Sequence, residues 1–312
     1  MRVSARGLPR RVLSVAVACA RALAPGERGR ARDERRRESK ALRKHLRQLD
    51  RRLEKMNGKL ETVYDTAAPL AGARLQVGRL DYAKADIYLK LGSKAEVLRL
   101  RAPAKEPWTV QWIETWLRPG ETLYDVGANV GAYSLVAARQ HGGSIRVVAF
   151  EPGFATFASL CENVILNDLT DSVVPLPLAL GGRSELSSFT YSDVRAGAAR
   201  HTLGEGGEGA VPYRQPLLTH RLDDLVERYS LTAPNHLKID VDGPELAVLE
   251  GAEETLRSPG LRSLMIEVNA DQKDPIESFL AERGWPVHAY FRPTWKDPVP
   301  EWPVYVLFAR ET

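Results

Sequence analysis

Short apolar runs alternate with helical segments over most of the chain, and this alternation limits the fold more than any other feature of the sequence. We predict strands at Thr122–Val126, Arg146–Phe150, Val173–Leu178, Leu237–Val241 and Ser263–Val268. We predict helices between and after them at Tyr133–Gln140, Ala155–Asn167, Asp223–Tyr229, Pro244–Arg257 and Pro275–Arg283. Apolar strands joined by helices are typical of a parallel sheet covered on both faces. The sequence therefore predicts an α/β fold with a doubly wound, mostly parallel sheet.

The segments on either side of this region have different patterns. Val287–Phe291 and Val304–Phe308 have no helix between them, which predicts a closing antiparallel strand pair. Before the first parallel strand, Ala85–Leu89 and Val97–Leu100 are predicted as strands, and Pro107–Leu117 as a helix with proline in its first turn.

The N-terminal segment is basic, although the 312 residues contain 44 Lys and Arg against 40 Asp and Glu. Residues 1–60 hold 19 basic and 6 acidic side chains, a net charge of +13, so the remainder (25 and 34) carries −9. We predict a basic helical arm over 1–64 and a catalytic domain over 65–312. Such an arm suits an acidic partner or an anionic membrane surface, and a solvated helix is the alternative.

Apolar residues in this arm alternate at spacings of three and four from Leu42 to Val63, as in a coiled coil. The seam is formed by Leu42, Leu46, Leu49, Leu53, Met56, Leu60 and Val63. Self-association through this seam and packing of the seam on the chain's own domain remain equally open.

Two features bear on the location of the protein. Cys19 and Cys161 are too few and too far apart for a disulfide framework or a zinc site, as expected for the reducing cytoplasm. Val12–Ala20 resembles the core of a secretory signal, but it is about half the length of a membrane-spanning helix. We expect a cytoplasmic protein, with a peripheral membrane location as the alternative and export disfavoured.

A glycine-bearing turn follows the first parallel strand, where open α/β sheets bind nucleotide-like ligands. Gly127 and Gly131 flank Asn129, and Asp125 ends the strand. A dinucleotide site needs the closer spacing G-x-G-x-x-G, and a carboxylate at the strand end would repel phosphate. Asp125 instead suits the ammonium group of a methionine moiety, and the following helix N-terminus suits its carboxylate.

Glu151 ends the second strand, 26 positions after Asp125. A carboxylate there can accept hydrogen bonds from both hydroxyls of a ribose. The turn and Glu151 together predict an adenosine-type pocket, with Asp125, Gly127, Asn129, Gly131 and Glu151 binding the cofactor.

The strand at 237–241 carries ionisable residues at alternating positions. Lys238, Asp240 and Asp242 are expected on one face of the strand, and Glu267 and Asn269 at the end of the next strand. These side chains should meet the pocket at the carboxyl edge of the sheet, although an ion pair between Lys238 and Asp240 with a purely structural role is the alternative.

A hydroxyl acceptor needs a group that takes its proton. Asp240 and Asp242 are the preferred candidates, Lys238 accompanies them, and His201 is a candidate from the Gly-rich loop Arg195–Gly209. We interpret this loop as mobile over the site, or as an insertion without a role. No metal site is predicted, although Asp240, Asp242 and Glu267 leave Mg²⁺ open as an alternative.

Several ordered motifs over 121–269 resemble the FkbM-type methyltransferases. They are Asp125-Val-Gly-Ala-Asn-Val-Gly131, Ala149-Phe-Glu-Pro152, Leu222-Asp-Asp-Leu225, Leu237-Lys-Ile-Asp-Val-Asp-Gly243, Glu250-Gly-Ala252 and Ile266-Glu267. The resemblance implies a class I methyltransferase fold, S-adenosyl-L-methionine as donor, and O-methylation of a saccharide, glycolipid or secondary-metabolite hydroxyl. Position 242 is Asp where many members have Glu, and Pro244 follows Gly243.

Two other classes of protein stay as alternatives. A nicotinamide-dependent oxidoreductase is disfavoured by the missing third glycine and by Asp125. A nucleic-acid-associated protein would use the basic arm, and we consider it unlikely, because the basic charge lies outside the pocket region.

Overall fold

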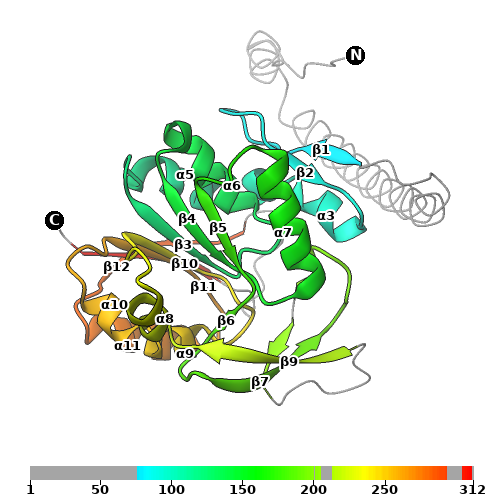
Figure 1. Ribbon diagram of the computed structural model, residues 1–312. Helices are drawn as coiled ribbons and strands as arrows, with labels where there is room; N and C mark the ends of the chain where they lie inside the picture. The colour runs from blue at the N-terminus through cyan, green and yellow to red at the C-terminus, as the bar shows by residue number, and fades with distance from the viewer. Residues whose placement is uncertain (1–75, 200, 205–212, 294–303, 311–312) are drawn as a thin grey trace, which may run out of the picture. The chain divides into compact units, whose positions relative to one another are not determined.

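A seven-stranded sheet runs through the centre of the protein in the computed structural model, which describes residues 76–199, 201–204, 213–293 and 304–310 (Figure 1). The strand order is β12-β13-β11-β10-β3-β4-β5. The strands are β3 (Thr122–Val126), β4 (Arg146–Phe150), β5 (Val173–Leu176), β10 (His236–Ile239), β11 (Ser263–Val268), β12 (Val287–Phe291) and β13 (Val304–Ala309). From β11 to β5 neighbouring strands are parallel, and β13 is antiparallel to both β11 and β12. The predicted doubly wound, mostly parallel sheet with a closing antiparallel pair is confirmed.

Helices cover both faces of this sheet (Figure 1). One face packs against α5 (Pro107–Trp116), α6 (Ala132–Arg139) and α7 (Phe154–Leu166). The other packs against α8 (Leu222–Tyr229), α9 (Glu245–Glu250), α10 (Glu253–Arg257) and α11 (Lys273–Ala281). A short 3-10 turn, η1 (Gln140–Gly143), follows α6.

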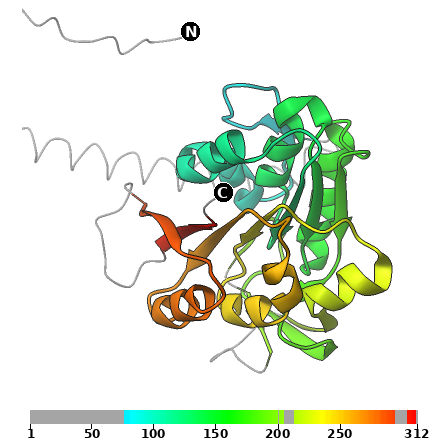
Figure 2. The ribbon, with the colours of Figure 1, turned by 90° about the vertical axis from the view of Figure 1, so that its left-hand side faces the viewer.

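Side-chain alternation along the strands separates two apolar cores. In β3, Leu123 belongs to the first core, whereas Tyr124 and Val126 belong to the second. β12 and β13, orange and red in Figure 2, lie together at one edge of the sheet.

A second sheet of four strands was not predicted from the sequence. Its order is β6-β9-β7-β8, and its strands are β6 (Ala179–Leu180), β7 (Glu185–Tyr191), β8 (Thr202–Leu203) and β9 (Tyr213–His220). β7 and β9 mix polar and apolar residues and are partly exposed, so they lack the continuous apolar pattern of the central strands. The predicted strand Val173–Leu178 is correspondingly shorter, since β5 ends at Leu176.

The segment before β3 corrects one prediction. It contains β1 (Val77–Arg79), β2 (Tyr88–Lys90), α3 (Lys94–Arg99), α4 (Ala102–Lys105) and α5. Val97–Leu100, predicted as a strand, lies almost entirely in α3 and is a wrong prediction. Ser93 caps this helix by accepting a hydrogen bond from the Glu96 amide (3.1 Å), and Glu96 Oε2 accepts one from the Gly92 amide. This Ser-x-x-Glu cap favours the helix over the strand.

One predicted helix is divided in two, and one predicted strand is shorter than expected. The predicted helix Pro244–Arg257 is two helices, α9 and α10, separated at Gly251 and Ala252. A β-carbon on Gly251 would lie 2.1 Å from the Gly181 carbonyl oxygen, so the break allows a close backbone approach. β10 ends at Ile239 rather than at Val241.

The predicted arm over 1–64, its seam and the boundary at 64/65 lie outside the described residues. No helix among the described residues is both long enough and apolar enough to cross a membrane.

Candidate active site

The glycine turn after β3 brings the backbone of β10 close to the site. Gly127 has φ +79°, and a β-carbon there would lie 1.9 Å from the Asp240 carbonyl oxygen. Gly131 has φ +88°, and its β-carbon would lie 2.5 Å from the Leu160 side chain. Only glycine combines this left-handed conformation with these contacts. The two glycines therefore set the shape of the turn, and α6 begins directly after it.

Glu151, at the end of β4, is oriented by two backbone amides. Its Oε2 accepts a hydrogen bond from Asn129 N (2.9 Å) and its Oε1 accepts one from Gly153 N (2.8 Å). Burial raises the pKa of Glu151 to about 7, although both amides oppose the rise. Each carboxylate oxygen can accept a further hydrogen bond. Glu151 is thus oriented as an acceptor for a neighbouring pair of hydroxyls.

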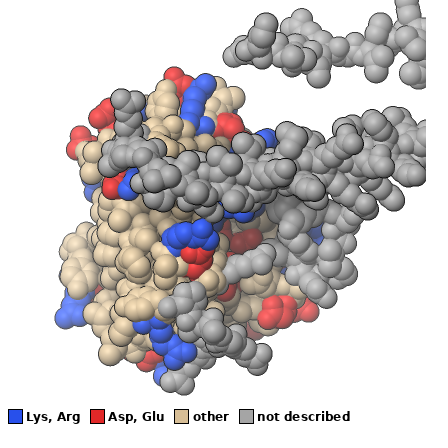
Figure 3. Space-filling view, turned by 90° about the vertical axis from the view of Figure 1, so that its right-hand side faces the viewer, with Lys and Arg blue, Asp and Glu red and all other residues tan. Residues whose placement is uncertain are grey.

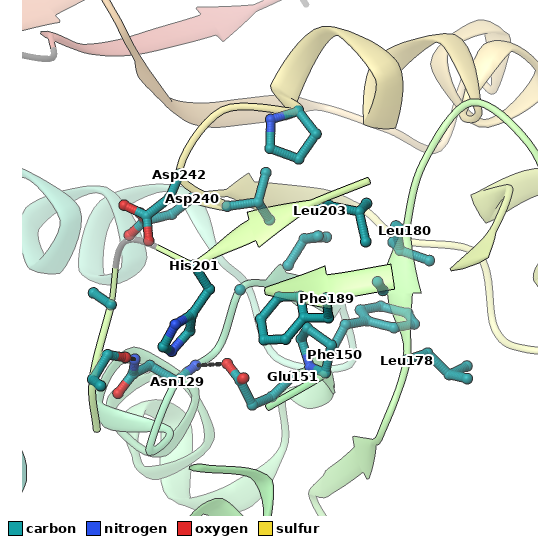
Figure 4. Close-up of a pocket in the computed structure, with 18 residues that line it drawn as sticks. Asn129, Phe150, Glu151, Leu178, Leu180, Phe189, His201, Leu203, Asp240 and Asp242 are labelled. Atoms are coloured by element: carbon teal, nitrogen blue, oxygen red, sulfur yellow. Dashed lines mark hydrogen bonds between the residues drawn. The ribbon is translucent and has the colours of Figure 1, made fainter. Parts of the chain in front are cut away.

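A small, mostly apolar cavity of about 70 Å³ lies beside Glu151. Its apolar lining includes Phe150, Leu178, Leu180, Phe189, Leu203 and Val241. Figure 4 shows Asn129, His201, Asp240 and Asp242 on one side of this space and the leucines on the other. The second sheet supplies Leu180, Phe189 and Leu203, which sequence reasoning did not find.

Lys238 lies buried between two aspartates. Its Nζ lies 3.0 Å from Asp240 Oδ2 and 3.5 Å from Asp125 Oδ1. Ser134 Oγ donates a 2.6 Å hydrogen bond to Asp125 Oδ2. Asp125 is fully buried and lines neither of the two cavities described here. In this structure Asp125 faces Lys238 and Ser134, and its predicted contact with a ligand ammonium group stays a prediction.

Asp240 and Glu267 form a coupled carboxyl pair beside Lys238. Burial by itself would raise the pKa of Asp240, but Lys238 and a hydrogen bond with Glu267 hold that pKa well below its usual range. Burial and the Asp240 charge raise the pKa of Glu267 well above its usual range. Tyr305 Oη donates to Glu267 Oε1 at 2.8 Å. The pair thus favours a proton on Glu267 over one on Asp240, so Asp240 is the stronger hydrogen-bond acceptor of the two and a weak base.

A larger cavity of about 720 Å³ opens next to the apolar one. The residues that line both are Gly127, Asn129, Ala199, His201, Asp240 and Asp242. Three more of the predicted residues, Lys238, Glu267 and Asn269, line the larger cavity but not the apolar one. The structure thus brings the predicted residues of β10 and β11 together at the carboxyl edge of the sheet.

Asp242 lies beyond the end of β10 and not within a strand. Its φ of +57° is left-handed. The expected strand alternation of Lys238, Asp240 and Asp242 therefore does not extend to Asp242. Its side chain still reaches both cavities and is exposed, so it lies where an acceptor can approach.

His201 lines both cavities from the loop after β7. Its Nδ1 accepts a hydrogen bond from Ser192 N at 3.3 Å, and its ring packs on Phe189 and Tyr191. Burial lowers the pKa of His201, so the ring is neutral at neutral pH. A neutral ring that accepts at Nδ1 carries its proton on Nε2. The Nε2 group is therefore a hydrogen-bond donor in this geometry, which disfavours His201 as the base.

Sequence reasoning missed the residues that α3 to α6 and β13 contribute to the larger cavity. They are Arg99, Lys105, Glu106, Tyr133 and Tyr305. Tyr133 follows the glycine turn directly, which was a usable signal. The others lie far from the motifs in sequence, and only the tertiary structure brings them to the site. Among the described residues, no group of three His, Cys, Asp or Glu side chains is arranged to hold a metal ion.

Comparison with known proteins finds methyltransferases. The profile of the Methyltransferase FkbM domain matches residues 125–285. The chain is 30% identical over 182 residues to the hexuronic acid methyltransferase AglP of Haloferax volcanii, covering 58% of this chain and 71% of that protein. It is also 30% identical over 176 residues to the 31-O-demethyl-FK506 methyltransferase FkbM of Streptomyces tacrolimicus, covering 49% and 67%.

Among solved structures, the methyltransferase FkbM from Methylobacillus flagellatus KT superposes with a TM-score of 0.46 at 15% identity. The match covers 69% of this chain and about half (52%) of that one.

Proposed function

Because the chain belongs to the FkbM family of methyltransferases, we propose that it transfers a methyl group from S-adenosyl-L-methionine to a hydroxyl oxygen. The observation that carries this proposal is the meeting of two cavities. One is apolar with Glu151 at its edge, the other is lined by acidic side chains, and Asp240 and Asp242 line both.

The chemistry of Glu151 and of the apolar side chains beside it suits an adenosine. The two oxygens of Glu151 are positioned to accept the ribose hydroxyls, and the leucine and phenylalanine side chains suit the adenine ring. When bound, S-adenosyl-L-methionine supplies an electrophilic methyl carbon on a sulfonium. Asp240 and Asp242, which line both cavities, would then lie between the adenosine and the acceptor.

We assign Asp242 as the base and Asp240 as the group that orients the acceptor. With the donor bound, transfer would join the acceptor oxygen to the methyl carbon and release S-adenosylhomocysteine, and Asp242 would take the hydroxyl proton. Asp240 is held ionised by Lys238, so it accepts a hydrogen bond well and takes up a proton poorly. The negative charge of Asp240 thus helps to orient the acceptor hydroxyl, and correct orientation accounts for much of the rate acceleration in such a displacement.

The acceptor class we propose is a saccharide, a glycolipid or a secondary metabolite. Its support is that one relative is named for hexuronic acid and another for 31-O-demethyl-FK506. Four acidic side chains along the larger cavity also suit an acceptor with several hydroxyls, namely Glu106, Asp240, Asp242 and Glu267.

For the basic arm we propose contact with an acidic partner or an anionic membrane surface, with self-association through the seam Leu42 to Val63. We propose a cytoplasmic location. The net charge of +13 over 1–60 supports the proposed contact with an acidic partner or an anionic membrane surface.

On the face of the domain shown in Figure 3, the described Lys and Arg side chains are interspersed with Asp and Glu. The described side chains visible on this face form no broad basic surface of the kind that follows nucleic-acid phosphates.

Calorimetry with S-adenosylhomocysteine and with NAD tests the donor. Binding of the first alone supports the proposal, whereas binding of NAD alone supports an oxidoreductase. Transfer of label from S-adenosyl-L-methionine into native-host extract, followed by analysis of the product, then identifies the acceptor. A chain lacking residues 1–64 should keep this turnover if the arm serves only location.

A further inference from the structure

Arg99, at the end of α3, directs a positive charge into the larger cavity. Its Nε and Nη2 both donate to the Gly197 carbonyl oxygen at 3.2 Å. A guanidinium has five N–H donors, so this single acceptor fixes the plane of the group and leaves the other donors available. Within the described ranges, no carboxylate forms an ion pair with Arg99.

The positive charge of Arg99 acts on three titratable groups near the site, Glu151, Tyr133 and His201. Burial raises the pKa of Glu151, and Arg99 is among the influences that oppose the rise. Burial also dominates the pKa values of Tyr133 and His201, and the Arg99 charge lowers both. Arg99 lines the larger cavity together with Tyr133, in the first turn of α6, and with His201, and its charge also acts on Glu151.

Arg99 belongs to a set of side chains that donate hydrogen bonds to four consecutive backbone carbonyls, those of residues 196–199. We call residues 196–199 the strap. Ser93 Oγ donates to the Ala196 oxygen (2.6 Å), Asn129 Nδ2 to Ala198 (2.9 Å) and Ser192 Oγ to Ala199 (2.7 Å). Arg99 holds the remaining carbonyl, that of Gly197. Each carbonyl of the strap thus accepts a side-chain hydrogen bond, and the Gly197 carbonyl orients the Arg99 guanidinium.

We propose that Arg99 binds the carboxylate of the methionine moiety of the methyl donor. A guanidinium that has no carboxylate partner among the described residues, beside a ribose site and a helix N-terminus, matches the anionic end of an amino acid linked to that ribose. This inference rests on the proposed function and adds a donor-binding residue that lies outside the family match at 125–285. Arg99 also joins donor binding to the strap, since the same guanidinium contacts both.

S-adenosyl-L-methionine and its decarboxylated form differ only in that carboxylate, so calorimetry with both on the full chain tests the proposal. Arg99→Ala should weaken binding of S-adenosyl-L-methionine by about 10- to 100-fold and change binding of the decarboxylated compound less than about threefold. Arg99→Lys, which keeps the charge without the planar fork, should show a smaller loss confined to S-adenosyl-L-methionine. The control is Arg101→Ala, whose side chain is 80% exposed and which should leave both affinities unchanged.

Equal losses for both compounds in Arg99→Ala would show that Arg99 acts only through the strap, and no loss for either would remove it from the site. Both results overturn the proposal. Binding of the decarboxylated compound by the variant shows that it is folded, and should Arg99→Ala not fold, the selectivity of Arg99→Lys decides. If the unaltered protein binds neither compound, the proposed function itself fails.

Discussion

The buried Lys238 side chain donates a 3.0 Å hydrogen bond to Asp240, and its Nζ also faces Asp125 at 3.5 Å. This pairing ties the ends of β10 and β3 together below the two cavities. It explains how ionised groups are tolerated in the centre of the sheet, since an unpaired charge there would be costly.

Replacing Lys238 by Met should lower the free energy of unfolding by about 3 kcal/mol or more, because Asp125 and Asp240 lose their cation while remaining buried. Chemical denaturation measures the change. Lys90→Met is the control, because Lys90 pairs with Glu162 at the surface and should cost less than about 1 kcal/mol. Equal costs for the two variants would show that the central ion pair does not stabilise the fold.

Asp242→Asn should lower kcat about 100-fold or more, with donor affinity unchanged, because the amide cannot take the acceptor proton. Turnover of the acceptor identified by labelled transfer measures this. His201→Gln keeps a donor toward the cavity and should lose less than about tenfold, and Asp274→Asn, whose side chain is 94% exposed, should lose nothing. If Asp242→Asn retained full turnover, the base would lie elsewhere.

Binding of S-adenosylhomocysteine should weaken as the pH falls below about 7. Burial raises the pKa of Glu151 to about 7, and only its ionised form accepts hydrogen bonds from both ribose hydroxyls. The affinity should therefore be full above pH 7 and fall by up to about tenfold per pH unit below it. Calorimetry between pH 5 and 8 follows the change. Glu151→Gln should bind weakly at every pH and lose this dependence, and a flat profile for the unaltered protein would contradict the assignment.

The raised pKa of Glu151 also affects the stability of the fold, but stability falls with rising pH whereas binding of S-adenosylhomocysteine improves. The folded-state pKa of Glu151 lies above the ordinary carboxyl value of 4.5, so the folded protein holds this proton more tightly than the unfolded chain. The contribution of Glu151 to stability is thus full below about pH 4.5 and is lost as the pH rises through about 7. Glu151→Gln should remove this part of the pH dependence of unfolding.

Gly127→Ala should destabilise the protein far more than Gly120→Ala. Both glycines have left-handed φ angles, +79° and +84°, so both variants carry a backbone cost of about 1–2 kcal/mol. Nothing lies within 4 Å of a β-carbon on Gly120, whereas one on Gly127 would lie 1.9 Å from the Asp240 carbonyl oxygen. Comparing the thermal unfolding of the two variants isolates the clash. Similar losses would mean that the turn and β10 separate easily.

The sequence alone determined the central architecture, because the parallel strands of the main sheet are mostly apolar and most of them are followed directly by a helix. β3, β4, β11 and β12 have the predicted bounds. The glycine turn and the placement of Glu151 could also be predicted, since a left-handed turn needs glycine and the carboxyl ends of parallel strands share one edge.

Only the tertiary structure decided which acidic side chain pairs with a cation, which one favours the protonated form and which one lines a cavity. Asp125 and Asp242 look alike in the sequence, yet one is buried against Lys238 and the other is exposed at the cavity. The second sheet and the role of Arg99 could not be predicted from the sequence either, because both depend on contacts between residues far apart in the chain. Local pattern fixes periodicity and turns, whereas charge state and ligand contacts depend on burial and on neighbours that no local pattern specifies.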